Sequence, residues 1–354
     1  MDTISDWMKE RSEVSNKKQP VFSTCFTSNW NNTEVNEIDA YKSLKYFDNE
    51  AVLDVNKMNT EFKYFLDEIP VVNYEKFKLF SDLIHFYNFN DKLITSRSVL
   101  SRIMNTPFDV NEGRRKWIIK ARRLHDNGIH LYYDKDQENI SDKMDKQYEM
   151  LKRYLFLKYP LDYHRKVTAA FNELFGQLFY LEFDNFELYY TTENPGVISN
   201  QELTNCVQVN SAEQVYCDIF EDGEFSDDLI NYNPIWWSKA ELIKAKQFIL
   251  ASYDKNNDCI KQIYKFNMDK FDDKAKYENL WSPDAAWNFL KDFLQFVKHS
   301  MDRVSSDVKE MCIWKFQSFP LNEPLVSCEI LINETENGKE KLTPLKLEDL
   351  NNFQ

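Results

Sequence analysis

The amino-acid sequence predicts an α+β fold, a single domain in which helices flank a mixed, twisted β-sheet core. Segments with helical and with extended periodicity are interspersed along the chain, and apolar residues make up 43% of it, enough for a large core. Neither an internal repeat nor a flexible linker divides the sequence. We therefore expect one domain over residues 21–332, between a disordered N-terminal tail of residues 1–20 and a polar C-terminal tail of residues 333–354.

The stretch Trp236–Phe266 shows this alternation of elements most clearly. Apolar residues at helical spacing open it, and they give way to the continuous apolar run Phe248–Ala251, which is typical of a strand buried on both faces. Asp254–Asp258 is a polar turn rich in Asn and Asp, residues that bond their own backbone and tolerate left-handed geometry. A second extended, apolar-rich segment begins at Ile260. We expect this helix-backed sheet to form the core and any functional site to lie near it.

The helices are predicted from apolar stripes and from their boundary residues. Tyr74–Tyr87 places its aromatic and aliphatic residues on one stripe, and Arg97–Met104 is a shorter helix of the same kind. Ser141–Tyr159 is the longest helical pattern. Pro283–His299 is strongly patterned, and Ser282 is a suitable cap for its first turn.

The strands are predicted from short apolar segments that turn residues separate. Trp117–Ile119 and Ile129–Tyr133 are two such segments, and Phe179–Thr192 has the pattern of a hairpin that turns at Asp184-Asn185. The remaining strands are expected at Val21–Trp30, Gln214–Phe220, Cys312–Phe316 and Leu325–Ile332, with loops at Asn194–Asn210 and Glu221–Asp228.

Composition excludes several classes of function. The 6 glycines are too few and too dispersed for the Gly-rich phosphate loops of P-loop and dinucleotide-binding enzymes. The net charge of -14 argues against a protein that coats nucleic acid non-specifically, and we expect no DNA partner. The 6 cysteines form no C-x-x-C pair and predict no zinc site. The polar N-terminus and the lack of a membrane-spanning segment predict an intracellular protein with reduced thiols and no membrane partner.

Three stretches resemble the Rai/DXO family of decapping nucleases. WWSKAELIKAKQFILASYDKNNDCIKQIYKF (Trp236–Phe266) follows without a gap the family's pattern of a tryptophan pair, a helix, an aliphatic strand, an Asx-rich turn and another strand. WSPDAAWNFLKDFLQF (Trp281–Phe296) is similar to the helix after the family's W-x-P motif. RSVLSRIMNTPFDVNEGRRKWII (Arg97–Ile119) is similar to the family's "TPY" segment, which leads into its first catalytic strand.

This resemblance implies a mixed β-sheet core with a pocket for the 5′ end of RNA, and it implies nuclear residence, with the cytoplasm as the alternative. In the family, carboxylates from adjacent strands bind divalent metal ions. Two such ions, Mg²⁺ or Mn²⁺, clamp a phosphate, activate a water molecule and neutralise the leaving oxygen. A divalent metal is therefore the expected cofactor if the chain is active, and no cofactor is expected otherwise.

The sequence departs from the family's pattern at nearly every chemical position. The family's first-strand arginine falls on Lys120, with Arg122 close behind. Its G-Y-x-φ-E glutamate falls on Lys158, or on Asp162 if the chain shifts, and its glutamine after the tryptophan pair falls on Lys239. Lysines at these positions would make the pocket cationic, and we expect such a pocket to bind phosphate without metal.

Two carboxylates keep positions that match the family's metal ligands. Glu193 fits the family's E-x-D strand, although Glu182 and Asp184 spell the same motif at the hairpin turn, and the choice between them stays open. Asp218 matches the acid of the family's E-φ-K strand, where Phe220 replaces the lysine. Glu193 and Asp218 are therefore the candidate catalytic and metal-binding residues, and two ligands are few for a two-metal site.

These departures lead to three hypotheses. In the first, catalysis is impaired, as in the Cutoff-like branch of the family, and the chain engages RNA 5′ ends. In the second, it is an active Mg²⁺- or Mn²⁺-dependent decapping nuclease that acts on aberrantly capped or NAD-capped RNA. In the third, it is a protein-interaction module that binds a protein partner and no RNA. The candidate substrate-binding residues are Lys120, Arg122, Lys158, Trp237 and Lys239, although the helical spacing of Trp237 also fits a core position.

Overall fold

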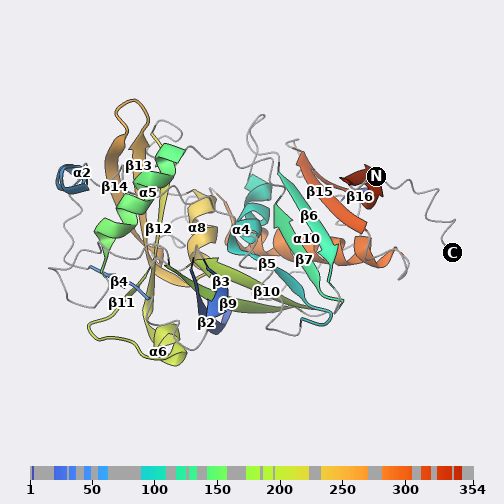
Figure 1. Cartoon of the computed structure of the whole chain (residues 1–354), viewed down its shortest axis with the longest axis horizontal. Helices are drawn as coiled ribbons and strands as arrows, with labels where there is room; N and C mark the ends of the chain where they lie inside the picture. The colour runs from blue at the N-terminus through green and yellow to red at the C-terminus, as the bar shows by residue number, and fades with distance from the viewer. Residues whose placement is uncertain are drawn as a thin grey trace.

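In the computed structural model, the chain folds around two mixed β-sheets, with helices between them and outside them (Figure 1). The predicted α+β class is confirmed, with two sheets where one was expected. The structure describes residues 2–3, 20–29, 32–36, 44–48, 55–62, 89–108, 117–124, 127–133, 142–157, 173–183, 186–193, 196–222, 233–269, 281–304, 312–319, 325–336 and 339–344.

The larger sheet has eleven strands within these residues. They are β1 (Asp2–Thr3), β2 (Val21–Asn29), β3 (Asn32–Asn36), β5 (Leu93–Ser96), β6 (Ile118–Arg123), β7 (Ile129–Tyr133), β9 (Glu173–Phe183), β10 (Phe186–Glu193), β15 (Cys312–Phe319), β16 (Leu325–Glu336) and β17 (Lys339–Pro344). Their order is β1, β16, β15, β6, β7, β5, β10, β9, β2 and β3, and β17 pairs with β16. β5 is parallel to both of its neighbours, β7 and β10, so their carboxyl ends meet at one edge.

The smaller sheet contains both strands predicted within Trp236–Phe266. Its described strands are β4 (Tyr46–Phe47), β8 (Phe156–Leu157), β11 (Gly196–Ile198), β12 (Glu213–Glu221), β13 (Ala245–Asp254) and β14 (Cys259–Asn267), in the order β14, β13, β12, β11, β4, β8. β13 lies between β12 and β14, and its run Phe248–Ala251 is fully buried, as predicted. Asp258 has a φ of 51° in the turn to β14, the left-handed geometry that Asx residues tolerate.

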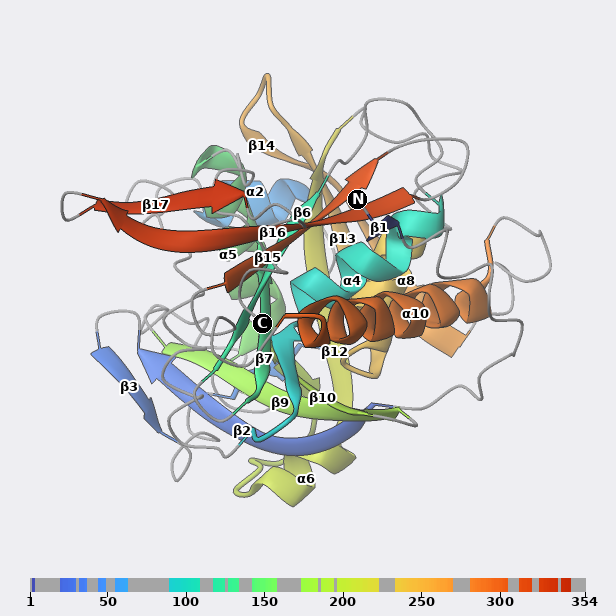
Figure 2. The same cartoon turned by 90° about the vertical axis from the view of Figure 1, so that its right-hand side faces the viewer.

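Three helices pack together next to both sheets. α4 (Arg97–Asn105) contacts α8 (Pro234–Glu241) and α10 (Pro283–Asp302), and it also contacts β5 and β10, while α8 contacts β13 (Figures 1 and 2). Their apolar faces form the main hydrophobic cluster together with both sheets. The Oγ of Ser282 accepts a hydrogen bond from the backbone N–H of Ala285 at 3.3 Å, which confirms the predicted cap of α10.

Two further helices cover the other face of the smaller sheet. α5 (Asp142–Leu155) packs on β12 and β13, and α2 (Val55–Phe62) packs on β14, around a second apolar cluster. α6 (Cys206–Ser211) contacts β2 of the larger sheet. None of the helices that the structure describes is long and apolar enough to cross a membrane.

Several predicted segments differ from the structure. The stretch Asn194–Asn210 is not a continuous loop, because β11 and part of α6 lie within it. The predicted tails contribute β1 and β17. β1 and β17 both pair antiparallel with β16. The expectation that every thiol is reduced is wrong for Cys206, which is disulfide-bonded. The predicted helix at residues 74–87 lies outside the described residues.

Candidate functional site

Two residues of the site stand at the carboxyl ends of neighbouring parallel strands in the larger sheet. The register of β5 and β10 places Ser96 opposite Thr191. Arg97, which follows Ser96 and begins α4, and Glu193, the last residue of β10, therefore leave the sheet at the same edge. The topology alone brings a cation and a carboxylate together at the edge that faces the smaller sheet (Figure 1).

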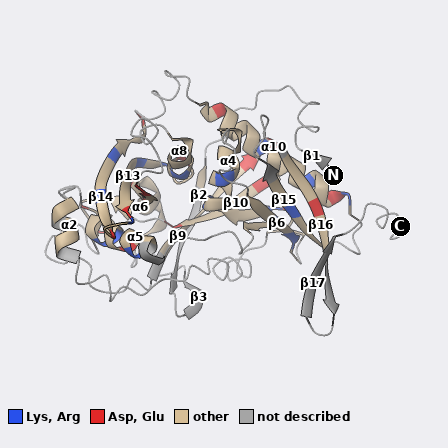
Figure 3. Cartoon of the chain, turned by 90° about the horizontal axis from the view of Figure 1, so that it is seen from above, with Lys and Arg blue, Asp and Glu red and all other residues tan. Residues whose placement is uncertain are grey.

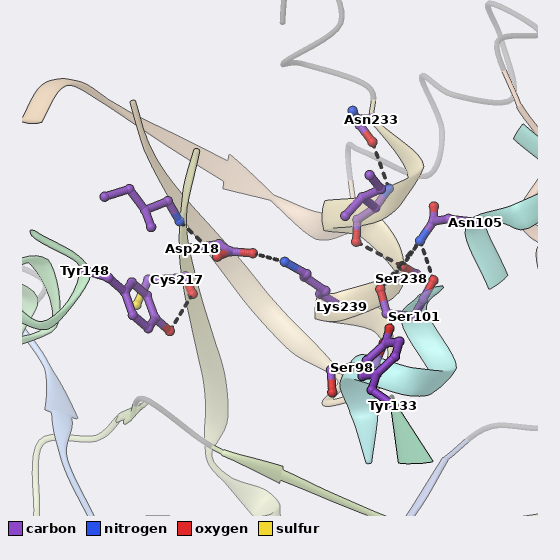
Figure 4. A network of polar contacts seen from close by, with 12 residues as sticks. Ser98, Ser101, Asn105, Tyr133, Tyr148, Cys217, Asp218, Asn233, Ser238 and Lys239 are labelled. Atoms are coloured by element: carbon purple, nitrogen blue, oxygen red, sulfur yellow. Dashed lines mark hydrogen bonds and ion pairs between the residues drawn. The ribbon is translucent and has the colours of Figure 1, made fainter. Parts of the chain in front are cut away.

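The smaller sheet contributes a third charge, Asp218 of β12, which is paired with Lys239 of α8. Lys239 Nζ donates to Asp218 Oδ2, and the backbone N–H of Ile219 donates to Asp218 Oδ1 at 2.9 Å. Figure 4 shows the lysine and aspartate side chains extending toward each other between α8 and β12. Both oxygens of this carboxylate therefore have a donor from the chain itself.

A second lysine is held by two carboxylates. Lys152 Nζ, on α5, lies 2.5 Å from Oε1 of Glu149, one turn earlier, and 2.9 Å from Oε1 of Glu193 on β10. The ammonium group also lies 4.7 Å from the ring centroid of Tyr148, within the range of a cation–π contact. α5 packs on the smaller sheet, and β10 belongs to the larger one. The contacts of Lys152 with Glu149 and Glu193, which we call the Lys152 clamp, therefore join the two sheets.

Arg97 lies near both contacts, since the charges of Asp218 and Glu193 each act on its guanidinium. Its Cζ lies 4.2 Å from the ring centroid of Tyr216, and its Nη1 is buried without a hydrogen-bond partner among the described residues. Burial opposes the charge of Arg97, but Tyr216, Tyr148, Asp218 and Glu193 act in the opposite direction and raise its pKa above the ordinary value. The guanidinium is therefore charged, and its Nη1 donates to none of the described residues.

Another amine, Lys45, lies close to the Lys152 clamp. Burial is the main cause that lowers the pKa of Lys45 to about 8, and the charge of Lys152 adds to it, while Glu149 and Glu193 act in the opposite direction. Its backbone carbonyl accepts a hydrogen bond from the N–H of Val197 at 3.0 Å, which fixes this segment next to β11. This side of the site therefore concentrates buried positive charge.

Two residues beside the charged groups stay neutral. Burial raises the pKa of Tyr148 and of the Cys217 thiol well above their ordinary values. The Tyr148 hydroxyl donates to the backbone carbonyl of Cys217 at 3.2 Å, as Figure 4 shows. Because a buried neutral thiol is a poor nucleophile, the geometry gives no support to cysteine-based catalysis at this position.

A buried polar network fixes α4 against α8 behind the site. The hydroxyl oxygens of Ser101 and Ser238 lie 2.7 Å apart, and Asn105 Nδ2 donates to Ser238 Oγ at 2.7 Å (Figure 4). Ser101 stands one helical turn after Arg97, and Ser238 directly precedes Lys239. The network therefore holds in place the two helices that carry these cations.

The structure brings together three of the residues that the sequence singled out. Glu193 and Asp218 come from different sheets and meet around Arg97, and Lys239 lies with them as the partner of Asp218. Glu182 is not beside them, because the hairpin register pairs it with Glu187, near the opposite end of the hairpin from Glu193. This favours Glu193 as the acidic residue at the site.

The other predicted substrate contacts are elsewhere or lie outside the described residues. Trp237 is wholly buried and packs on Trp281 with ring centroids 4.8 Å apart, which is the core position that its helical spacing also fits and leaves no exposed surface for the predicted contact with RNA. Lys120 and Arg122 lie on β6, two strands from β5 in the larger sheet, and their substrate role stays a prediction. Lys158 is not described, and neither are Asp162 and Asp184.

Sequence reasoning missed Arg97 and Lys152. Arg97 directly follows the buried strand Leu93–Ser96, and a cation at the end of such a strand is a signal for a site. Lys152 stands four residues after Tyr148 and next to Leu151, so the helical period already places it on the apolar side of α5. A lysine at such a position needs a buried partner, which its sequence neighbours alone do not identify.

The described side chains do not fit a divalent metal ion. Mg²⁺ and Mn²⁺ prefer several oxygen ligands. Across the described ranges, no group of three or more His, Cys, Asp or Glu side chains is arranged to hold a metal. Glu149, Glu193 and Asp218 each have a lysine ammonium on a carboxylate oxygen, so the predicted role of Glu193 and Asp218 as metal ligands conflicts with their contacts.

No protein-family model matches the sequence, and no curated protein matches it significantly. Solved structures do resemble it. Candida albicans Rai1 in complex with pU5-Mn2+ aligns with a TM-score of 0.63 at 13% identity, over 97% of this chain and 93% of that one. Scheffersomyces stipitis Rai1 in complex with (3'-NADP)+ and calcium ion aligns with a TM-score of 0.60 at 11% identity, over 97% of this chain and 93% of that one. K. lactis Dxo1 in complex with manganese aligns with a TM-score of 0.55 at 11% identity, over 94% of this chain and 93% of that one. The chain therefore has the fold of the Rai1 and Dxo1 structures, as its motifs predicted.

Proposed function

We propose that this chain binds the 5′ end of RNA through its phosphate and does not hydrolyse it. The observation that carries the proposal is the state of Arg97, a partly buried charged residue whose buried Nη1 has no hydrogen-bond acceptor among the described residues. The carboxylates around it are already paired with lysines. The likeness in fold to Rai1 in complex with pU5-Mn2+ supports RNA as the ligand.

The chemistry of the guanidinium favours phosphate. Arginine presents planar, parallel N–H donors that match phosphate oxygens, and such charge-assisted bonds are about twice as strong as neutral ones. Tyr216 lies under the guanidinium and limits its movement. A terminal phosphate can enter a buried site, whereas an internal phosphodiester brings a nucleotide on each side. The geometry therefore favours an RNA end over an internal segment.

The same geometry argues against hydrolysis. Phosphoryl hydrolysis in this fold family is expected to use metal ions that activate water and neutralise the leaving oxygen. In this chain, Lys152 and Lys239 occupy the carboxylates that would hold such ions. Ammonium groups can hold a phosphate, but they cannot lower the pKa of a bound water as a divalent ion does.

The direct test compares two RNAs of the same sequence, one with a 5′-monophosphate and one with a 5′-hydroxyl. Binding is measured by fluorescence anisotropy in EDTA at several salt concentrations. We expect the monophosphate RNA to bind more tightly, with salt-sensitive affinity. Arg97→Met should lower the ratio of the two affinities by about 10- to 150-fold, since a hydrogen bond to a charged group contributes about 1.5–3 kcal/mol. Arg102→Met, on the same helix, is the matched control and should bind like the wild type.

A second assay separates the alternatives. The wild-type chain is incubated with monophosphorylated, capped and NAD-capped RNA and with Mg²⁺ or Mn²⁺, and the products are resolved by electrophoresis. We expect no product. Metal-dependent product would favour the active nuclease instead, and absence of any RNA binding in the first assay would favour the protein-interaction module.

A further inference from the structure

The Lys152 clamp holds a cation between two acidic side chains that the fold brings together from far apart in the sequence. Glu149 comes from α5 and Glu193 from the end of β10, and both Oε1 atoms contact the same ammonium, at 2.5 and 2.9 Å. The side chains are 7% and 20% exposed, and that of Lys152 is 5% exposed. Two carboxylates this close and this buried repel each other unless a cation lies between them.

We infer that the Lys152 ammonium is a built-in cation, which takes the place of a divalent metal ion between Glu149 and Glu193 and keeps such ions out. The solved structures of the same fold include complexes with manganese and with calcium. In this chain, the positive charge between Glu149 and Glu193 is supplied by a side chain that cannot dissociate. This inference concerns the carboxylates and not Arg97, so it stands or falls separately from RNA binding.

Tethering explains why the ammonium would exclude metal. A metal ion must first displace Lys152 from both carboxylates, and the lysine competes as an intramolecular ligand at a high effective concentration. The displaced ammonium would then be buried beside a divalent cation, where like charges repel. Removing the ammonium removes both obstacles and leaves two neighbouring carboxylates that have lost the cation they share. Such a pair is a starting set of oxygen ligands for Mn²⁺, with water completing the coordination.

The other lysine of the site offers a contrast. Lys239 contacts a single carboxylate, Asp218, whose second oxygen is bonded by a backbone N–H. Its removal would leave one carboxylate oxygen without a partner and no pair of ligands. The exposed contact of Lys261 with Asp222, at 2.6 Å, is similarly a single pair. The inference therefore predicts a metal site only where two carboxylates share one ammonium.

The test is Mn²⁺ binding by the full chain, measured from the loss of the free Mn²⁺ signal in electron paramagnetic resonance. We expect the wild type to leave the signal unchanged, and Lys152→Met to bind one Mn²⁺ per chain. Mn²⁺ should also raise the melting temperature of Lys152→Met and leave that of the wild type unaltered, because a ligand stabilises the state that binds it. Lys261→Met is the matched control and should behave like the wild type.

Two further variants keep the test decisive. Lys152→Gln retains a polar side chain of similar length, and should bind Mn²⁺ if Lys152→Met proves too unstable to purify. Combining Lys152→Gln with Glu193→Gln should abolish the binding, which assigns the ion to this pair. The inference is overturned if the wild type binds Mn²⁺ as tightly as the variants, or if neither folded single variant binds it.

Discussion

Among the described residues of the site, the Lys152 clamp and the contact of Lys239 with Asp218 differ in burial. In the Lys152 clamp, the side chains of Lys152 and Glu149 are 5% and 7% exposed, whereas those of Lys239 and Asp218 are 28% and 15% exposed. Breaking a buried ion pair by removing one partner costs about 3–5 kcal/mol, and an exposed pair contributes about 0–1 kcal/mol. The Lys152 clamp is therefore part of what holds the fold together, and the Lys239 contact is not.

This difference assigns separate tasks to the two lysines. Lys152 joins α5 to β10, and if it left Glu149 and Glu193, the two carboxylates would lose the ammonium that they share. Lys239 is partly open to solvent, so it can turn from Asp218 toward an incoming phosphate at little cost. Figure 3 shows basic and acidic residues interspersed along the strands and helices of both sheets. A static clamp beside an adjustable lysine suits a site that binds an anion without metal.

The largest expected effect comes from breaking the clamp. Lys152→Met should lower the free energy of unfolding by about 3–5 kcal/mol at pH 7, because it takes away the ammonium that the buried carboxylates of Glu149 and Glu193 share. Urea denaturation followed by circular dichroism measures it. Adding Glu149→Gln to Lys152→Met should recover part of the loss. A loss below about 1 kcal/mol for the single variant would show that the clamp behaves like an exposed pair.

The amine of Lys45, beside the Lys152 clamp, should make the free energy of unfolding depend on pH. The pKa of Lys45 is about 8 in the folded chain and about 10.4 when unfolded, so the folded state releases this proton first. Between these values the unfolded state binds more protons, and stability should rise with pH by on the order of 3 kcal/mol. Below pH 8 the full penalty of the buried charge is present.

Lys45→Met removes this titrating amine from the clamp side. Relative to the wild type, the variant should be more stable at pH 7, and the advantage should shrink as the pH rises from about 8 to about 10.4. The difference between the two denaturation curves across this pH range isolates Lys45 from other groups. If the free energies of unfolding of the two proteins changed with pH in parallel, the pKa of Lys45 would not be lowered by folding.

The smallest effect on stability is expected for the adjustable lysine. Lys239→Met should change the free energy of unfolding by about 1 kcal/mol or less, since its contact with Asp218 is partly exposed. It should nevertheless weaken binding of 5′-monophosphorylated RNA, because a cation near the anion is lost. A double-mutant cycle with Asp218→Asn measures the coupling. Coupling as strong as that between Lys152 and Glu193 would remove the distinction between the two contacts.

The sequence was sufficient for elements that local patterns determine. The run Phe248–Ala251 formed a buried central strand and Phe179–Thr192 formed a hairpin, since period and turn residues specify both. Lys152 was missed because its partner Glu193 is 41 residues away, and only the packing of α5 beside β10 brings the two together. For Trp237 the sequence left both a contact with RNA and a core position open, and only the tertiary packing on Trp281 decides for the core.

The central claim is that the lysines make anion binding independent of divalent metal. The most direct test is the dissociation constant of the wild-type chain for 5′-monophosphorylated RNA, measured in EDTA and again in millimolar Mn²⁺ at matched ionic strength. We expect the same dissociation constant in both conditions. Binding that appears only with Mn²⁺, or becomes tighter by about tenfold or more, which is about 1.4 kcal/mol, would contradict it.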